Sequence, residues 1–225
     1  MAAIQGYELA DFMYKNCENI RIVIVGAGGF GREVASWYLD SYGYEQNIVF
    51  LDDTKTGVIA IGPHQFRVVS DLDTYVRNSH DKVLMGVASP YAKQDIANKF
   101  GQKNIQFSTF IHKSVIRSLG ADIGEGSIIC PNSVLSDNVK LGKLTTVNLC
   151  CTIGHDSSIG DYTTLSSHVD ITGRCQIGKF VFWGSGSRII PNKYISDGCK
   201  IGAGSLIMHN IPEGKTVYCP PSKTM

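Results

Sequence analysis

The sequence predicts a small α/β domain with a Rossmann-like parallel sheet, followed by an all-β domain that forms a parallel β-helix. Three observations lead to this prediction. In the first half, apolar strands alternate with helical segments, and a glycine-rich turn joins the first strand to the first helix. In the second half, an apolar residue recurs at every sixth position. We place an N-terminal extension at residues 1–20, the α/β domain at 21–108, and the β-helix with its C-terminal tail at 109–225.

The α/β domain is expected to contain strands that alternate with helices and therefore run parallel in one sheet. The expected elements are a strand at 22–25, a turn at 26–31, a helix that begins at 32–39, a strand at 47–51, a strand at 82–88 and a helix at 90–100.

The turn after the first strand has the GxGxxG spacing, with glycines at Gly26, Gly28 and Gly31. The acidic pair Asp52 and Asp53 follows the second strand, about twenty residues on, which is the pattern of dinucleotide-binding domains. The open start of the helix suits a phosphate or pyrophosphate. The domain is short and lacks any sign of a hydride-acceptor site, so we expect no NAD. The acidic pair could also simply end its strand.

The second half repeats with a period of six, which fits neither an α-helix nor an ordinary strand. Such a period is typical of a triangular solenoid, in which each hexapeptide supplies one side and one corner and eighteen residues complete a coil. The apolar residue of each repeat is expected to point into the prism. These residues are Ile123, Ile129, Leu135, Leu141, Val147, Ile153, Ile159, Leu165, Ile171, Ile177, Trp183, Ile189, Ile195, Ile201 and Ile207.

Small residues occupy two other positions of the repeat. The position after the apolar residue is mostly glycine, and we expect glycine there to fit a crowded corner and to supply unusual φ/ψ angles. The fourth position after it is small or β-branched. Cys151, Cys175 and Cys199 fall in this fourth position and Cys130 in the first, so we interpret these four as structural. Cys150, at a turn, is less settled.

The composition excludes several classes of function. The net charge of the 225 residues is +1, which favours neither nucleic acid nor a membrane surface. No apolar run is long enough to span a bilayer, and the N-terminus has no apolar signal core. The seven cysteines form no CxxC pair and no metal-ligand spacing. We therefore expect a cytoplasmic protein without a metal.

Hexapeptides of the form Ile-Gly-x-x-Ser-x behind the segment GAGGFGREV resemble the hexapeptide acyltransferase superfamily. Within it, the chain from Arg21 onward resembles the sialic-acid O-acetyltransferase and bacillosamine N-acetyltransferase family, which acetylates nucleotide-linked amino sugars. Two segments depart from the family: Ser167-His168-Val169 replaces a Pro-Gly-Ala-like stretch, and Cys219-Pro-Pro-Ser222 replaces Gly-Asn-Pro-Ala. The matching segments are 26–31, 50–53, 111–114, 147–148, 154–156 and 159–161.

The resemblance implies a left-handed β-helix, a homotrimer with active sites at subunit interfaces, and acetyl-CoA as co-substrate. It assigns His155 as general base and Asp156 as its partner. Gly173 lies one coil of eighteen residues after His155, and the resemblance implies that its N–H receives the thioester oxygen. From the residues alone, His155 could equally be a solvated corner histidine, and Gly173 a corner glycine needed for its φ/ψ.

The resemblance also implies the remaining contacts. The nucleotide-sugar residues are Gly26, Gly28, Gly29, Phe30, Gly31, Asp52, Asp53 and Lys55. The acetyl-CoA residues are Asn148, His168, Gly173, Gly184, Ser185, Gly202, Ala203 and Lys223. Asn148 could contact the sugar substrate instead, and His168 could be a surface residue.

The leading hypothesis is an acetyl-CoA-dependent N-acetyltransferase that acts on the 4-amino group of a UDP-, dTDP- or GDP-linked 4-amino-4,6-dideoxy sugar for a surface glycan. One alternative keeps the acyl transfer but changes the acceptor to a hydroxyl or the donor to a longer acyl chain. An alternative of another class is a non-catalytic β-helix protein that binds a nucleotide sugar.

Overall fold

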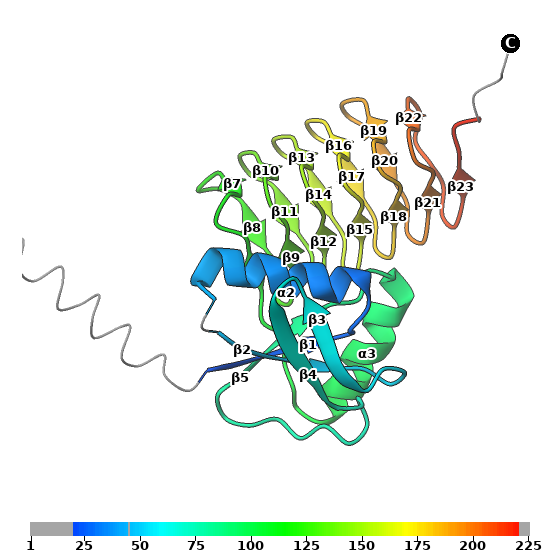
Figure 1. The fold of residues 1–225 in the computed structure, drawn as a ribbon. Coiled ribbons are helices and arrows are strands. Elements are labelled where there is room, and N and C mark those ends of the chain that lie inside the picture. Colours follow the sequence, from blue (N-terminus) through cyan, green and yellow to red (C-terminus); the bar gives the residue numbers. More distant parts are fainter. Residues whose placement is uncertain (1–19, 45, 221–225) are drawn as a thin grey trace, which may run out of the picture.

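The computed structural model describes residues 20–44 and 46–220. The expected extension therefore lies, except for residue 20, outside the described residues, and so does Lys223. Figure 1 shows the α/β domain beside the first coils of the β-helix, with α2 lying across the junction. The remaining coils extend away from the α/β domain toward the C-terminal end of the chain.

The α/β domain contains one five-stranded sheet with the strand order β3-β4-β2-β1-β5. β1, β2, β4 and β5 run parallel, whereas β3 runs antiparallel to β4. The elements are β1 (Arg21–Val25), α2 (Gly29–Tyr42), β2 (Asn47–Leu51), β3 (Gly57–Ile61), β4 (His64–Ser70), β5 (Asp81–Met85) and α3 (Pro90–Gln102).

The predicted parallel sheet is therefore corrected to a mixed one, because the sequence reading missed the hairpin of β3 and β4. β3 (sequence GVIAI) does carry an apolar run, as β1 does, but both strands of the hairpin are mostly half-buried or exposed. The strand expected at 82–88 ends earlier, at Met85. Gly86, the next residue, lies close against β1: a Cβ at this position would lie 2.7 Å from the side chain of Ile24, so the fold requires glycine there.

One helix covers each face of the sheet. The side chains of β1 alternate, so that Ile22 and Ile24 pack in the cluster that contains α2, and Val23 and Val25 pack in the cluster that contains Phe100 of α3. Each cluster continues into the β-helix: the first includes Phe110, Ile128 and Cys130, and the second includes Leu144 and Tyr162. The two domains thus share a continuous apolar core.

The C-terminal end of α2 is fixed to the first coil of the β-helix. The Asp40 carboxylate lies 3.0 Å from Nε2 of the buried His112 and 3.1 Å from Nζ of Lys113. His112 Nδ1 in turn lies 2.8 Å from the hydroxyl of Ser114. These contacts hold α2 against the solenoid at the end opposite its glycine turn.

The β-helix consists of two-residue strands in three parallel sheets of six, five and seven strands. Every hydrogen-bonded pair inside the predicted run differs by eighteen residues, for example Ile153 with Ile171. The fold predicted from the six-residue period is confirmed, and strands also lie on both sides of the predicted run, at Phe110–Ile111, Ile116–Arg117 and Thr216–Val217.

The strands of the three sheets are as follows. The seven-stranded sheet contains β6 (Phe110–Ile111), β9 (Ile128–Ile129), β12 (Thr146–Val147), β15 (Thr164–Leu165), β18 (Phe182–Trp183), β21 (Lys200–Ile201) and β23 (Thr216–Val217). The six-stranded sheet contains β7 (Ile116–Arg117), β10 (Val134–Leu135), β13 (Thr152–Ile153), β16 (Asp170–Ile171), β19 (Arg188–Ile189) and β22 (Leu206–Ile207). The five-stranded sheet contains β8 (Asp122–Ile123), β11 (Lys140–Leu141), β14 (Ser158–Ile159), β17 (Gln176–Ile177) and β20 (Tyr194–Ile195).

The glycines after the apolar residues are required for space and not for unusual backbone angles. A Cβ at Gly154 would lie 2.6 Å from the backbone nitrogen of Gly173 in the next coil, and Gly160 is similarly crowded by Gly178. The positive φ angles fall two residues later, at the third position after the apolar residue, which corrects the expectation. Non-glycine residues with positive φ there are Asn132, Asn138, Leu144, Cys150, Asp156, Tyr162, His168, Arg174, Phe180 and Asn192.

The four cysteines interpreted as structural are all buried, each with an exposed fraction of 0%. Cys151 and Cys175 reach carbonyl oxygens of the next coil with their thiols, as the small residues at this position do elsewhere. The structural interpretation of Cys130, Cys151, Cys175 and Cys199 is confirmed. Cys150 is half-buried at a turn, with a φ of 55°.

The Asp81 carboxylate links β5 to β1 at the N-terminal ends of these strands, opposite the end that carries the glycine turn. It is buried, and it accepts two hydrogen bonds from Arg21, one from the Tyr75 hydroxyl and one from the N–H of Asn78. Burial by itself raises the pKa of Asp81, but these donors outweigh it, so that the pKa lies below its ordinary value.

Because the folded pKa of Asp81 is lowered, its contribution to stability is present above the ordinary aspartate pKa and is lost as the pH falls through the folded value. We expect Asp81→Asn to lower the free energy of unfolding by about 3 kcal/mol at pH 7. The difference from the wild type should shrink below about pH 4. Urea titrations across this range measure it, with Asp73→Asn, an exposed carboxylate, as the control. A pH-independent difference would contradict the assignment.

Candidate active site

His155 and Asp156 form a pair on the corner that follows β13. Nδ1 of His155 lies 2.8 Å from Oδ2 of Asp156. The hydrogen bond to His155 lowers the pKa of the Asp156 carboxyl, which favours its charged form. A carboxylate beside Nδ1 favours the tautomer that carries its proton there. Nε2 is then an acceptor that can take up a proton.

Gly173 lies directly beside the free edge of the His155 ring. A Cβ at Gly173 would lie 2.7 Å from Nε2 of His155. The backbone N–H of Gly173 donates to no acceptor among the described residues. Only glycine fits at position 154, because a Cβ there would lie 2.6 Å from the Gly173 nitrogen. No side chain of residue 154 therefore covers this N–H. The register of eighteen thus places Gly173 beside the ring of His155, as the coil length predicted.

Asn138 is a member of this cluster that the sequence reading missed. It lies one coil before Asp156, and its Nδ2 donates to Oδ1 of Asp156 at 2.9 Å. Each oxygen of Asp156 therefore has one partner, which fixes the plane of the carboxylate. The same step of eighteen from Asp156 points to Asn138 in the sequence, so the coil length was a signal that could have found it.

The other predicted coenzyme residues lie on a different corner, the one that follows the strands of the seven-stranded sheet. Asn148 follows β12 and His168 follows β15. Gly184 and Ser185 follow β18, and Gly202 and Ala203 follow β21. The side of the prism formed by β13 and β16 separates this corner from His155 and Gly173. The structure therefore divides the predicted coenzyme residues between two edges of the prism.

Asn148 and His168 differ in how they are held. Oδ1 of Asn148 accepts the N–H of Leu149 at 2.7 Å, and its Nδ2 has no partner among the described residues. His168 is exposed, has a φ of 61°, and is fixed through its backbone, which donates to Leu149 at 2.9 Å. Both side chains thus present unused polar groups at this corner.

The glycine turn before α2 contains glycines that the fold requires and glycines that it does not. Gly26 has a φ of 96°, and a Cβ at Gly31 would overlap the carbonyl oxygen of Gly26, so the fold requires glycine at both positions. At Gly28 and Gly29, in contrast, a Cβ would meet nothing within 4 Å. Gly28 caps α2 without a side-chain hydrogen bond.

The N–H groups at the start of α2 are unused. The first hydrogen bond of the helix comes from Arg32 to Gly28, so the N–H groups of Gly29, Phe30 and Gly31 have no acceptor within the described part of the chain. Together with the helix dipole, such groups attract anions.

The acidic pair after β2 is largely occupied by the fold. Asp52 accepts the N–H of Ala27 at 2.7 Å and three further hydrogen bonds from Thr54 and Lys55. Asp53 accepts the N–H of Leu72 at 2.8 Å, and Nζ of Lys55 donates to Ala27 at 2.9 Å. These residues shape the glycine turn, which places Lys55 beside it.

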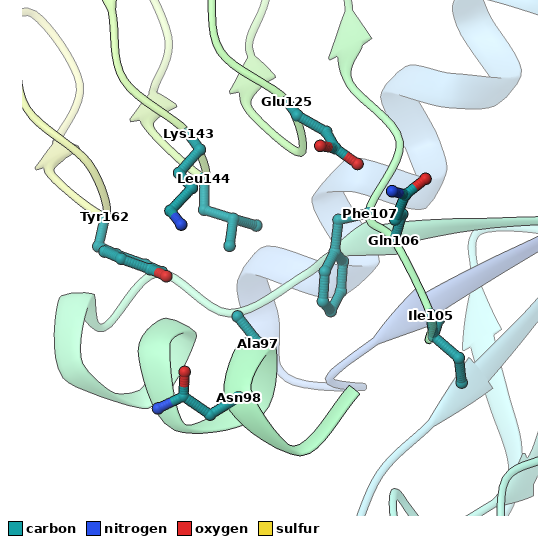
Figure 2. A pocket seen from close by; sticks show the side chains of 9 residues that line it. All are labelled: Ala97, Asn98, Ile105, Gln106, Phe107, Glu125, Lys143, Leu144 and Tyr162. Atoms are coloured by element: carbon teal, nitrogen blue, oxygen red, sulfur yellow. The ribbon is translucent and has the colours of Figure 1, made fainter. Parts of the chain in front are cut away.

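One pocket lies away from His155, between α3 and the corner that follows the five-stranded sheet. It has a volume of about 250 Å³. Figure 2 shows Leu144 and Tyr162 of the β-helix facing Ala97 of α3 across it, with Lys143 and Glu125 at its rim. His155 itself is open to solvent, with 54% of its side chain exposed.

Among residues 20–44 and 46–220, no group of three or more histidine, cysteine or acidic side chains is arranged to hold a metal ion. In the same residues, no helix is both long and apolar enough to cross a membrane.

Comparison with known proteins gives matches over nearly the whole chain. Residues 21–100 match the family described as the PglD N-terminal domain. GDP-perosamine N-acetyltransferase of Escherichia coli O157:H7 is 28% identical over 213 residues, which cover 90% of this chain and 95% of the relative.

Solved structures of acetyltransferases also match nearly the whole chain. The acetyltransferase domain of PglB from Neisseria gonorrhoeae FA1090 has a TM-score of 0.82 and 26% identity, and covers 92% of this chain and 100% of its own. That domain has also been solved in complex with acetyl coenzyme A, with 25% identity to this chain. PerB from Caulobacter crescentus, solved with CoA and GDP-perosamine, shares the fold with a TM-score of 0.76 and 23% identity, and covers 90% of this chain and 95% of its own.

The glycine turn allows a test of which glycines the fold requires. We expect Gly31→Ala to lower the free energy of unfolding by about 3 kcal/mol, because the added Cβ overlaps the Gly26 carbonyl. Gly29→Ala, in the same turn, should leave stability unchanged or raise it by up to about 1 kcal/mol, because alanine favours the helix. Thermal and urea unfolding of both variants measure this. Equal destabilisation would show that the turn differs from the one described.

Proposed function

We propose a specific reaction for this chain, which is a sugar acetyltransferase of the hexapeptide-repeat superfamily: transfer of the acetyl group of acetyl-CoA to the 4-amino group of a nucleotide-linked 4-amino-4,6-dideoxy sugar. The family predicted from the sequence is confirmed, and the chain is an enzyme, which removes the non-catalytic alternative. The reaction would serve the synthesis of a surface glycan. One observation carries the proposed mechanism: the His155–Asp156 pair lies beside Gly173, whose backbone N–H has no acceptor among the described residues.

In the proposed mechanism, the amino group of the sugar attacks the thioester carbonyl while Nε2 of His155 accepts its proton. The Asp156 carboxylate holds the ring and stabilises its protonated form. The N–H of Gly173 donates to the oxyanion that develops on the carbonyl oxygen. The C–N bond forms, the C–S bond breaks, and the proton on His155 passes to the departing CoA thiolate.

The α/β domain would hold the nucleotide. The unused N–H groups at the start of α2 suit a diphosphate, and the open space at Gly28 and Gly29 lets it approach the backbone. Lys55 lies beside this turn and adds a positive charge. Asp53 has one carboxylate oxygen left for the ribose or base. The relative named for GDP-perosamine makes a GDP-linked sugar the first acceptor to test, ahead of UDP- and dTDP-linked ones.

The active site would be completed by a second subunit of a homotrimer. His155 is half-exposed, whereas acyl transfer gains from a site that excludes water. The predicted coenzyme residues lie on another edge of the prism, so a neighbouring subunit can bring its edge to His155. The coenzyme would run past Asn148 and His168, then Gly184, Ser185, Gly202 and Ala203, toward Lys223. Acetyl-CoA and nucleotide sugars are cytoplasmic metabolites, which supports a cytoplasmic location.

Two finer alternatives stay open to test. The acceptor atom could be a hydroxyl instead of an amine, and the donor could carry a longer acyl chain. Mass spectrometry of the product formed from GDP-perosamine gives the mass of the group added, and hydroxylamine treatment distinguishes an ester, which it cleaves, from an amide, which survives.

We expect His155→Ala to lower kcat/KM by about 10²-fold or more, because it removes the proton acceptor. Release of the CoA thiol, followed with Ellman's reagent, measures the rate. His209→Ala, at an exposed position on the same edge of the prism, is the matched control and should keep the wild-type rate. An unchanged rate in His155→Ala would remove this residue from the mechanism.

Gly173→Ala keeps the backbone N–H and tests the spacing between the proposed oxyanion donor and His155. The added Cβ would lie 2.7 Å from Nε2 of His155, so the ring must move away from the reacting atoms. Gly173 does not have a positive φ, so the backbone itself accepts alanine. We expect kcat to fall by about 10²-fold with an unchanged circular dichroism spectrum. Wild-type kcat in this variant would exclude the proposed geometry.

A further inference from the structure

Lys93 of α3 is fully buried, with an exposed fraction of 0%, although it carries an amine. Its Nζ reaches across the junction between the two domains to four oxygen atoms of the β-helix. These are the carbonyl oxygens of Leu144 (2.8 Å) and Thr163 (3.2 Å) and the hydroxyls of Thr146 (3.2 Å) and Thr164 (2.9 Å).

The hydrogen bonds around Lys93 fit an ammonium group. The two carbonyl oxygens can only accept, and the Thr164 hydroxyl already donates to the carbonyl oxygen of Ala88 at 2.6 Å. Three acceptors therefore match the three protons of an ammonium, whereas a neutral amine would turn a lone pair toward one of them. Burial lowers the pKa of Lys93, and this ring of oxygens opposes that effect.

On the side of the α/β domain, Lys93 is linked to the glycine turn. Ala88, which the Thr164 hydroxyl contacts, belongs to the segment between β5 and α3. Gly86 of the same segment lies under the turn: a Cβ at Gly26 would be 3.2 Å from its carbonyl oxygen. A displacement of this segment would therefore also move the backbone of the glycine turn that forms the proposed diphosphate site.

On the side of the β-helix, Lys93 holds the two strands that lead to the proposed coenzyme corner. Thr146 begins β12, and Asn148 follows one residue after that strand ends. Thr164 begins β15, which runs directly into the turn that carries His168. Lys93 thus bridges two neighbouring coils at the start of the strands that position these side chains.

An aromatic stack beside Lys93 keeps α3 seated. The ring of Tyr91 on α3 stacks on Phe180 at 5.3 Å, and Phe180 stacks on Tyr162 at 5.1 Å, with interplanar angles of 3° and 4°. Figure 2 shows Tyr162 and Leu144 facing the next turn of α3, at Ala97 and Asn98. The stacked rings bury apolar surface between α3 and the β-helix, and Lys93 adds hydrogen bonds of defined direction.

We propose that Lys93 is a positioning residue for the acetyl transfer: it sets the spacing between the glycine turn, which holds the nucleotide, and the strands that lead to the coenzyme corner. The inference rests on the function proposed above. Lys93 is buried at the domain junction and belongs to neither proposed ligand site, so each ligand should still bind when Lys93 is lost. The reacting atoms of the two ligands then no longer meet at the right distance, to which group transfer is highly sensitive.

The experiment compares Thr164→Val, which keeps the shape of the side chain but breaks the link from Lys93 to Ala88, with Thr164→Ser, which keeps the hydroxyl. Lys93→Met is the stronger variant. Lys99→Met on the same helix, at a partly exposed lysine, is its control. Calorimetry with CoA and with GDP gives the two affinities, and Ellman's assay with acetyl-CoA and GDP-perosamine gives kcat at saturation, well below the melting temperature.

We expect about a tenfold lower kcat for Thr164→Val and about 10²-fold for Lys93→Met, with both Kd values within twofold of the wild type. Thr164→Ser and Lys99→Met should keep the wild-type kcat. A lower melting temperature with unchanged kcat in Thr164→Val would overturn the inference and leave Lys93 a purely structural group. A wild-type protein that acetylates no nucleotide-linked amino sugar would instead overturn the proposed function.

Discussion

The hydrogen-bond register between successive coils is the constraint on which the site depends. Each strand of the β-helix pairs with the strand eighteen residues away, so the backbone decides which side chains become neighbours. His155 meets Gly173 and Asp156 meets Asn138 for this reason alone. A one-residue shift of a coil would turn the apolar stack outward as well, so the buried core protects the geometry of the corner.

A second constraint acts at the junction between the domains. The helix α2 carries the proposed anion site at its N-terminal end and contacts the first coil at its other end, through Asp40 and His112. The helix α3 contacts the coils that follow, through Lys93. With apolar clusters that continue across the boundary, the α/β domain is built onto the solenoid as one body. The proposed nucleotide site in the α/β domain is therefore held at a fixed position relative to the β-helix, without a hinge between them.

The parts of this structure that follow a strict period were predictable, and the parts that depend on a single long-range contact were not. The coil length gave the pairing of His155 with Gly173, and it contained the signal for Asn138. The β3–β4 hairpin was missed although residues 58–61 form an apolar run, because its two strands stay mostly half-buried or exposed at one edge of the sheet. Lys93 in a polar helix is indistinguishable by sequence from a surface lysine, because its acceptors lie more than fifty residues away. The coenzyme contacts proposed above would involve a second chain, which no internal pattern of this sequence describes.

The third position after the apolar residue of each repeat has left-handed backbone angles and recurs every six residues, and we call each such position a socket. Each socket points its side chain outward at a corner, and each costs about 1–2 kcal/mol of backbone strain when it is not glycine. On one edge this position holds Asp156, on the second His168, and on the third Phe180, whose ring stacks on Tyr91 of α3. A substitution in a socket changes what an edge of the prism presents while the strand pairing stays the same. Such a frame can acquire new contacts one corner at a time, which separates the evolution of its surface from the stability of its core.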